Sequence, residues 1–155
     1  MKAHRLRGQY ANAQDVAPDL LAALRGVEAY LQRCGLDRRL LDLVKMRASQ
    51  INGCAFCLDM HSKDLRRLGE SEQRVYLLDG WRESPLFDSR ECAALAWTEA
   101  VTRVADTRAP DAVFEQVRNL FDDKEIVDLT AIGMINLWNR LMISLRCDHP
   151  VDATA

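Results

Sequence analysis

Two cysteines, Cys54 and Cys57, stand three positions apart, and His61 follows four positions after the second. Each residue of a helix advances by about 100°, so on a helix the three side chains would face the same way. Residues three apart on a helix have Cα atoms roughly 5 to 5.5 Å apart, which a disulfide can bridge. The spacing therefore predicts a thiol pair that opens and closes without unfolding the chain, beside a histidine that can accept or return a proton.

The residue before the pair is Gly53, which indicates that the cysteines lie in the first turns of a helix. Free backbone N–H groups and the helix dipole at such an end favour a thiolate over a thiol. We therefore expect a lowered thiol pKa at this pair.

Two other roles for this constellation stay open. A cysteine pair can be inert in a helical core, and a lone histidine is more often structural than catalytic. Cys54, Cys57 and His61 would also supply three of the four ligands that a zinc site usually has. A fourth ligand is missing, because His4 and His149 lie in terminal segments and there is no second CxxC. The sequence therefore predicts that no metal is bound.

The other cysteines are scattered, although the chain has five in all. An odd number with one close pair argues against a secreted disulfide framework and for reduced thiols. Each isolated cysteine is interpreted as a small hydrophobic side chain. These are Cys34, Cys92 and Cys147.

Composition excludes several classes of protein. The hydrophobic fraction is 48%, the charged fraction is 28% and the formal charge is −2, which is typical of a soluble globular protein without attraction for nucleic acid. Polar residues interrupt the apolar stretch around 126–145, so it predicts a buried helix rather than a membrane span. Near the N-terminus no apolar segment resembles a secretory signal, and we expect a cytoplasmic protein.

Helical spacing recurs along the chain, and no alternation typical of strands is present. We predict an all-α protein with a single domain over residues 1–155. Its core would span about 17–146, between a loose N-terminal arm and a loose tail from Asp148. At this length the core needs no disulfide to fold.

Three predicted helices position the cysteines. The first runs over residues 18–34, and the second begins at the N-cap Asp37 and ends at the breaker 52–53. The third continues over residues 54–68 and carries the thiol pair at its start.

Later helices are predicted from two capping patterns, because Asp88 and Asp122 each stand three residues before a glutamate. The helix that Asp122 opens runs to about Leu145 and is apolar on nearly every face. Such a helix lies centrally in a core or is shared with another subunit. Its polar side chains should find hydrogen-bond partners on other helices or subunits. They include Asn136, Asn139 and Arg140.

A resemblance to a known family is carried by residues 43–63, LVKMRASQINGCAFCLDMHSK. This stretch resembles the core of the alkylhydroperoxidase D-like (AhpD-like) proteins of the carboxymuconolactone decarboxylase superfamily. The similarity covers about residues 36–146, with further matches at 69–74, 81–83, 95–100 and 135–140. The superfamily's decarboxylases lack the CxxC pair, so the resemblance is to the peroxidase-like branch. It implies a homo-oligomer of AhpD-like helical subunits, commonly a trimer or a hexamer.

The resemblance also implies roles for residues at matching positions. Cys57 would be the nucleophile, Cys54 the resolving cysteine and His61 the proton relay. Phe56 stands where better-known members have a histidine, and we expect it to pack away from the thiols.

Two carboxylates are further candidates for the site. Asp42 stands twelve residues before the first cysteine, where the family commonly has a glutamate, and its side chain is one methylene shorter. The proton relay is therefore expected to be longer or bridged by water. Glu99 is a weaker candidate for polarity at the site, with a simple exposed charge as the alternative.

These residues predict a thiol-dependent peroxidase of the alkyl hydroperoxide reductase type. Cys57 would attack a hydroperoxide, Cys54 would close a disulfide, and a dithiol reductant, by analogy a lipoyl-type carrier, would reopen it. No metal or organic cofactor is required. The alternatives are a dithiol–disulfide oxidoreductase and a redox-sensing helical oligomer without efficient peroxide turnover.

Overall fold

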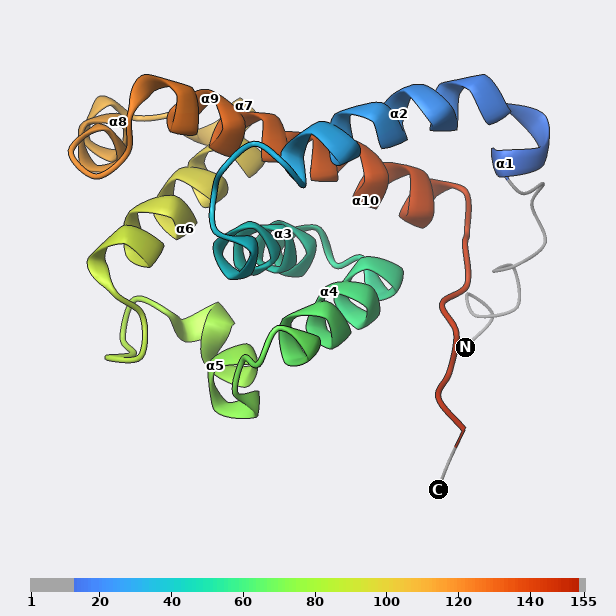
Figure 1. The fold of residues 1–155 in the computed structure, drawn as a ribbon, viewed down its shortest axis with the longest axis horizontal. Helices are drawn as coiled ribbons and strands as arrows, with labels where there is room; N and C mark the ends of the chain where they lie inside the picture. The colour runs from blue at the N-terminus through green and yellow to red at the C-terminus, as the bar shows by residue number, and fades with distance from the viewer. Residues whose placement is uncertain (1–12, 154–155) are drawn as a thin grey trace.

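The computed structural model describes residues 13–153, and over this range every regular element is a helix (Figure 1). The predicted all-α class is confirmed. The expected N-terminal arm falls mainly on residues 1–12, which lie outside the described residues. In chain order the helices are α1 (Ala13–Val16), α2 (Pro18–Leu31), α3 (Arg38–Asn52), α4 (Ala55–Arg67), α5 (Glu72–Leu77), α6 (Ser89–Thr102), α7 (Val104–Thr107), α8 (Asp111–Arg118), α9 (Asp123–Ala131) and α10 (Ile135–Ser144). Two 3-10 turns are η2 (Leu78–Gly80) and η3 (Ile132–Met134).

Helix α3 lies in the middle of the fold and packs against α4, α6 and α10 (Figure 1). Its apolar side chains Leu41, Leu43 and Val44 are almost completely buried. Because neighbours cover most of its faces, several polar side chains of α3 are also buried and need partners within the fold. These are Asp42, Lys45, Arg47 and Ser49.

The ends of α3 follow from its local sequence. At its start, the Leu40 N–H donates to Asp37 Oδ1 at 3.0 Å, so the predicted N-cap is confirmed. At its end, Gly53 adopts a left-handed φ of 67°, which lets the chain turn directly into α4. Helix α2 ends at Leu31, three residues before the predicted end, and the chain passes through Gly35, with φ 104°, toward α3.

Both predicted capping boxes are present, at the starts of α6 and α9. The long helix predicted after Asp122 is interrupted, because η3 separates α9 from α10. Gly133 lies in this turn, and a Cβ there would lie 3.1 Å from Val101 Cγ1 of α6. Glycine thus permits close approach of the two segments at the point where the helix tightens.

The helical run Asp123–Ser144 is apolar and long enough to cross a membrane by length and composition alone. It nevertheless contacts α3 and α6 through polar as well as apolar groups. The Asn52 amide donates to both Asn136 and Asn139, and Asn139 donates to Ser49 Oγ at 3.2 Å. The predicted hydrogen bonds between helices are therefore present. Arg140 is exposed.

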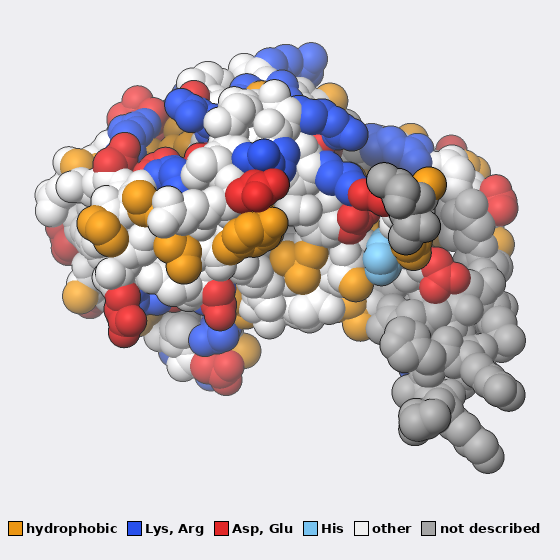
Figure 2. All heavy atoms as spheres, turned by 90° about the horizontal axis from the view of Figure 1, so that it is seen from below, with side chains coloured by type: hydrophobic (Ala, Val, Ile, Leu, Met, Phe, Trp, Pro, Cys, Tyr) orange, Lys and Arg blue, Asp and Glu red, His pale blue; other side chains and the backbone are white. Residues whose placement is uncertain are grey.

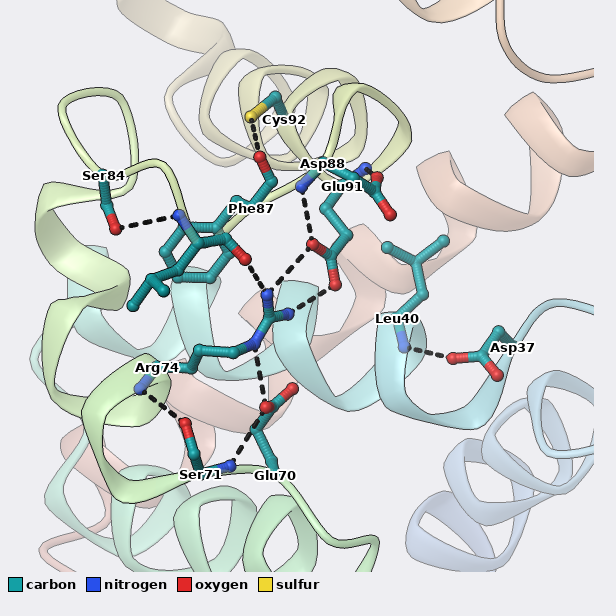
Figure 3. Close-up of polar contacts among 11 residues, drawn as sticks. Asp37, Leu40, Glu70, Ser71, Arg74, Ser84, Phe87, Asp88, Glu91 and Cys92 are labelled. Atoms are coloured by element: carbon teal, nitrogen blue, oxygen red, sulfur yellow. Dashed lines mark hydrogen bonds and ion pairs between the residues drawn. The ribbon is translucent and has the colours of Figure 1, made fainter.

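Arg74 of α5 stabilises the connections of this helix to α4 and α6 (Figure 3). Its Nε lies 2.8 Å from Glu70 Oε1, and its guanidinium also pairs with Glu91 and donates to the Leu86 carbonyl. The same group lies over the ring of Phe87, 4.7 Å from the centroid. These contacts hold the loop before α6 in place.

Basic and acidic side chains alternate over the face shown in Figure 2, with small apolar areas between them. This mixture agrees with the formal charge of −2. No field of a single sign dominates this face that would attract a polyanion.

Candidate functional site

The cysteine pair lies at the junction of α3 and α4. Cys54 has an extended backbone, with φ −85° and ψ 99°, and caps α4 because its Sγ accepts the Cys57 N–H at 3.3 Å. Cys57 therefore lies in the first turn of α4 as predicted. Cys54 is the N-cap and precedes the helix, so its projection onto the helix was wrong. The projection holds for Cys57 and His61, which are four residues apart on α4.

Cys54 and Cys57 are joined by a disulfide, with their Cα atoms 5.3 Å apart. Each residue is only 1% exposed, so both sulfurs are shielded from bulk solvent. The other three cysteines are free and half-buried.

A cavity of about 860 Å³ opens beside Cys57 and His61. Residues of α1, α2, α3, α4, α10 and the segment after α10 line it. Its wall is largely apolar, from Leu21, Phe56, Met60, Leu68, Ile135, Trp138, Met142 and Leu145. Of the two bonded cysteines, Cys57 lines this cavity, whereas Cys54 lines a much smaller recess next to it.

His61 is 4% exposed, and neither ring nitrogen has a hydrogen-bond partner among the described residues. Burial and then the charge of Lys45 lower its pKa to about 4, against the opposing effects of Asp64 and Glu28. The ring is therefore neutral near pH 7 and has a nitrogen free to accept a proton. Unsatisfied buried ring nitrogens in a cavity are available to a substrate or to water.

Asp42 lines the same cavity and is 5% exposed. Its pKa is raised by burial, despite the nearby charges of Lys45 and Arg38. No hydrogen bond links its carboxylate to His61 or to any other residue that the structure describes. A proton relay between these two groups would therefore need a bridging molecule, and the longer or water-bridged relay stays a prediction.

Lys45 and Glu28 also line the cavity, and sequence reasoning missed both. Lys45 is 2% exposed and its ammonium group forms an ion pair with Glu28 of α2. The sequence contains a signal for the buried position of Lys45, because this residue stands between the apolar Val44 and Met46 and one helical turn after Asp42. A lysine on a predicted buried face needs an acidic partner or a function.

Phe56 and Glu99 differ from expectation. Phe56 was expected to pack away from the thiols, yet it lines the cavity with Cys57, because α4 begins only one residue before it.

Glu99 neither lines this cavity nor stands exposed. It accepts hydrogen bonds from Arg47 Nε at 2.8 Å and Trp81 Nε1 at 2.9 Å, and it pairs with Arg82. Glu99 thus joins α6 to α3 and to the turn that follows η2.

Within residues 13–153, no group of three or more His, Cys, Asp or Glu side chains could hold a metal ion. His149 is exposed in the segment after α10, and His4 lies outside the described residues. The absence of zinc from this protein stays a prediction.

The sequence pattern of the Carboxymuconolactone decarboxylase family matches residues 17–100. The chain is also 38% identical, over 138 residues, to the uncharacterized protein YdfG of Bacillus subtilis strain 168. This match covers 88% of the chain and 94% of the relative. The matched residues 17–100 include Asp42, both bonded cysteines and His61.

Among solved structures, a protein of unknown function from Agrobacterium tumefaciens, provisionally named an antioxidant defence protein AhpD, is similar. The identity is 47% and the TM-score 0.89, covering 92% of this chain and 99% of that one. The debrominase Bmp8 has the same fold, with a TM-score of 0.78 at 20% identity, over 90% and 75% of the two chains. An uncharacterized peroxidase-related protein from Silicibacter sp. TM1040 also has this fold, with a TM-score of 0.71 at 22% identity. The match covers 86% of this chain and 78% of that one.

Proposed function

Because this chain belongs to the carboxymuconolactone decarboxylase family and has the AhpD-like all-α fold, we propose that it is a thiol-dependent peroxidase that reduces hydroperoxides. One observation carries the proposal. Cys57, bonded to Cys54, lines a largely apolar cavity together with a buried His61, whose ring nitrogens have no hydrogen-bond partner among residues 13–153. A nucleophile, a resolving thiol and a proton carrier are thus combined with room for an organic substrate.

In the first step, the reduced Cys57 gives its proton to His61 and attacks the O–O bond of the hydroperoxide as a thiolate. The bond breaks, one oxygen stays on sulfur as a sulfenic acid, and the other leaves as an alkoxide. His61 returns the proton to the alkoxide, and an alcohol departs. The pKa of about 4 keeps the ring neutral when the cycle begins, so it can accept a proton, but it also makes the ring a weak base, and the negative charge that develops on sulfur must stabilise the protonated ring.

The second step forms the disulfide. The Cys54 thiolate attacks the sulfenic sulfur of Cys57, and the hydroxyl group leaves as water after taking up a proton. Cys54 can act without a rearrangement of the chain, since its Sγ already contacts the Cys57 amide.

We assign the attack to Cys57 rather than Cys54 for two reasons. Cys57 lines the large cavity together with His61. Cys54 lines only the small recess, which has little room for a hydroperoxide.

The cycle needs an external dithiol to reopen the disulfide, and a lipoyl-type carrier is the reductant that we propose. Such a donor operates in a reducing compartment, so we place the protein in the cytoplasm.

We also propose a homo-oligomer, a trimer or a hexamer, which light scattering of the purified protein tests. Neither metal nor organic cofactor takes part.

A steady-state assay tests this function. The purified protein receives cumene hydroperoxide or hydrogen peroxide with dihydrolipoamide, thioredoxin or glutathione as reductant. Saturable peroxide consumption, lost in Cys57→Ser and retained in the matched control Cys34→Ser, is the expected result. Efficient turnover of disulfide substrates with negligible peroxide consumption would favour a dithiol oxidoreductase. Slow disulfide formation without any turnover would favour a redox sensor.

A further inference from the structure

The Cys54–Cys57 disulfide presents a problem of access. Both cysteines are 1% exposed, yet the proposed cycle requires an external dithiol to attack one of these sulfurs. Thiol exchange needs direct contact between the attacking sulfur and the sulfur that is attacked. Either the carrier enters the cavity, or the chain itself brings the disulfide to a more accessible sulfur.

Cys147, a free and half-buried cysteine, lies next to this pair. It lines the large cavity together with Cys57 and the small recess together with Cys54. The recess has room for about one water molecule, and a few residues form its wall. Cys147, just after the end of α10, therefore shares one small recess with Cys54 and the large cavity with Cys57.

The local backbone fixes this position. Helix α10 ends at Ser144, and Arg146 adopts a left-handed φ of 58°. The Cys147 N–H then donates to the Met142 carbonyl at 3.0 Å, so the chain reverses over the helix end. Further along, Lys63 Nζ of α4 lies 2.6 Å from Asp152 Oδ1. The turn at Cys147 is thus held against α10, and the segment expected to be a loose tail contacts α4 through Asp152.

The other two free cysteines lack this placement. Cys34 follows α2 and packs against the hydrophobic core. Cys92 lies on α6, where its Sγ contacts the Phe87 carbonyl oxygen at 3.6 Å, and burial raises the pKa of its thiol. Neither residue lines the cavity or the recess. Cys147 is distinguished from them by position rather than by residue type.

The cavity that Cys147 shares with Cys57 also holds a group able to move a proton. His61 lines it, is 4% exposed and has no hydrogen-bond partner on either ring nitrogen among the described residues. Exchange between thiols requires the attacking sulfur to lose a proton and the leaving sulfur to gain one. A neutral imidazole in the same cavity provides a carrier for that proton.

We propose that Cys147 is a third redox cysteine, which takes over the disulfide from Cys54 and Cys57 and presents it to the external dithiol. This inference rests on the proposed function for its place in a cycle. The exchange itself is a property of the three thiols and can be tested without peroxide.

The exchange balances without any further oxidant. The Cys147 thiolate attacks Cys54 Sγ, the Cys54–Cys57 bond breaks, and Cys57 leaves as a thiolate. The external dithiol then attacks Cys147 Sγ and releases Cys54 as a thiol. Its second sulfur attacks the mixed disulfide, closes the carrier disulfide and frees Cys147. The carrier loses two electrons in total. Cys57 is restored to its thiolate, and can react with peroxide again, before the carrier arrives.

Disulfide mapping tests the exchange directly. The Cys57→Ser variant leaves Cys54 and Cys147 as free thiols, and one equivalent of diamide should join them within the monomer. Peptide mapping by mass spectrometry after acid quenching and alkylation identifies the bond. A Cys54 that stays unpaired, or that pairs with Cys34 or Cys92 as often as with Cys147, overturns the proposal.

Kinetics of the two half-reactions test its role. With Cys147→Ser, oxidation of the reduced protein by cumene hydroperoxide should change far less than its reduction, because Cys147 only lines the cavity in that step and serine is similar in size. Reduction of the oxidised protein by dihydrolipoamide should slow by about tenfold or more. Cys34→Ser is the matched control and should change neither rate. An unchanged reduction rate in Cys147→Ser overturns the proposal.

Failure of the proposed function would look different. A wild-type protein that does not react with peroxide refutes the peroxidase, whereas the diamide experiment and the dihydrolipoamide rates still report on Cys147. A Cys147→Ala variant repeats the kinetic test without a hydroxyl group, so a defect shared by both variants is attributable to the lost sulfur.

Discussion

Lys45 and Glu28 form an ion pair in the wall of the cavity, although they come from different helices, α3 and α2. The lysine is almost completely buried, and a buried ammonium group without a partner would be strongly unfavourable. The pair also sets the electrostatic field at the site. The charge of Lys45 lowers the pKa of His61, and Glu28 opposes it.

The first prediction concerns this lysine. Lys45→Met keeps the volume but removes the charge, which leaves Glu28 unpaired and raises the pKa of His61. Cys57 lines the same cavity as Lys45, so removal of the cation should also make the Cys57 thiolate less favourable. We expect the rate of Cys57 oxidation at pH 7 to fall by about tenfold and its pH profile to move to higher pH, as stopped-flow measurements would show.

A double variant separates this effect from misfolding. Lys45→Met alone should lose about 1 to 3 kcal/mol of stability, since the partly exposed Glu28 carboxylate is left without its partner. Lys45→Met with Glu28→Gln should recover most of that stability without recovering the wild-type pH profile. Equal pH profiles in all three proteins would show that the pair is purely structural.

The second prediction separates the two bonded cysteines. Cys57→Ser should form no sulfenic acid with one equivalent of peroxide, because a hydroxyl group is a far weaker nucleophile than a thiolate. Cys54→Ser should still be oxidised once at Cys57, and the sulfenic acid should persist and become sulfinic acid in excess peroxide. Mass spectrometry of both variants measures this. Oxygen on Cys54 in Cys57→Ser, with Cys57 unmodified in Cys54→Ser, would reverse the roles.

Much of this fold could be predicted because its signals are local. Asp37, Asp88 and Asp122 cap helices through backbone groups three residues away, and Gly53 ends α3 through its own φ. Cys57 and His61 share a helix face for the same reason. Such features depend on a few neighbouring residues, so the sequence alone contains them.

The features that could not be predicted depend on distant residues. Glu28 meets Lys45 across 17 positions, and Cys147 reaches the cysteine pair only through the turn after α10. Glu99 looked like an exposed charge, because its partners Arg47 and Trp81 lie on other elements. The spacing of residues along one helix carries no information about contacts between residues of different elements.

The third prediction follows from the pKa of His61, which burial lowers from 6.5 to about 4. Above pH 6.5 the ring is neutral in both the folded and the unfolded state, so its titration affects stability little. Between pH 6.5 and 4 the unfolded chain binds the proton more readily, and stability falls as the pH falls. The full penalty, reached below pH 4, is about 3 kcal/mol for a shift of this size.

His61→Gln should lack this loss. Urea unfolding of the oxidised proteins between pH 4 and 7 measures it, and the difference between wild type and variant removes the contribution of carboxylates that titrate in the same range. Parallel curves for the two proteins would mean that His61 is hydrated and titrates normally.

The fourth prediction sets activity against stability at Asp42. Burial raises the pKa of this carboxyl group in the folded protein. The folded state therefore holds the proton more tightly than the unfolded state, and stability is lost as the pH rises through the folded pKa. At pH 7, Asp42→Asn should raise the free energy of unfolding, because the amide avoids the cost of a buried charge. This gain should disappear as the pH falls and the wild-type carboxyl group is protonated.

The same substitution should slow the oxidation of Cys57, since a proton relay through Asp42 would lose its acceptor. The loss should be smaller than that in His61→Ala, for which we expect about 10² to 10⁴ fold, the usual worth of a positioned acid or base. Urea unfolding at several pH values and single-turnover oxidation rates measure the two effects on one preparation. A variant that is more stable and fully active would remove Asp42 from the mechanism. One that is less stable at pH 7 would show that the carboxylate has a hydrogen-bonding partner that the amide cannot satisfy.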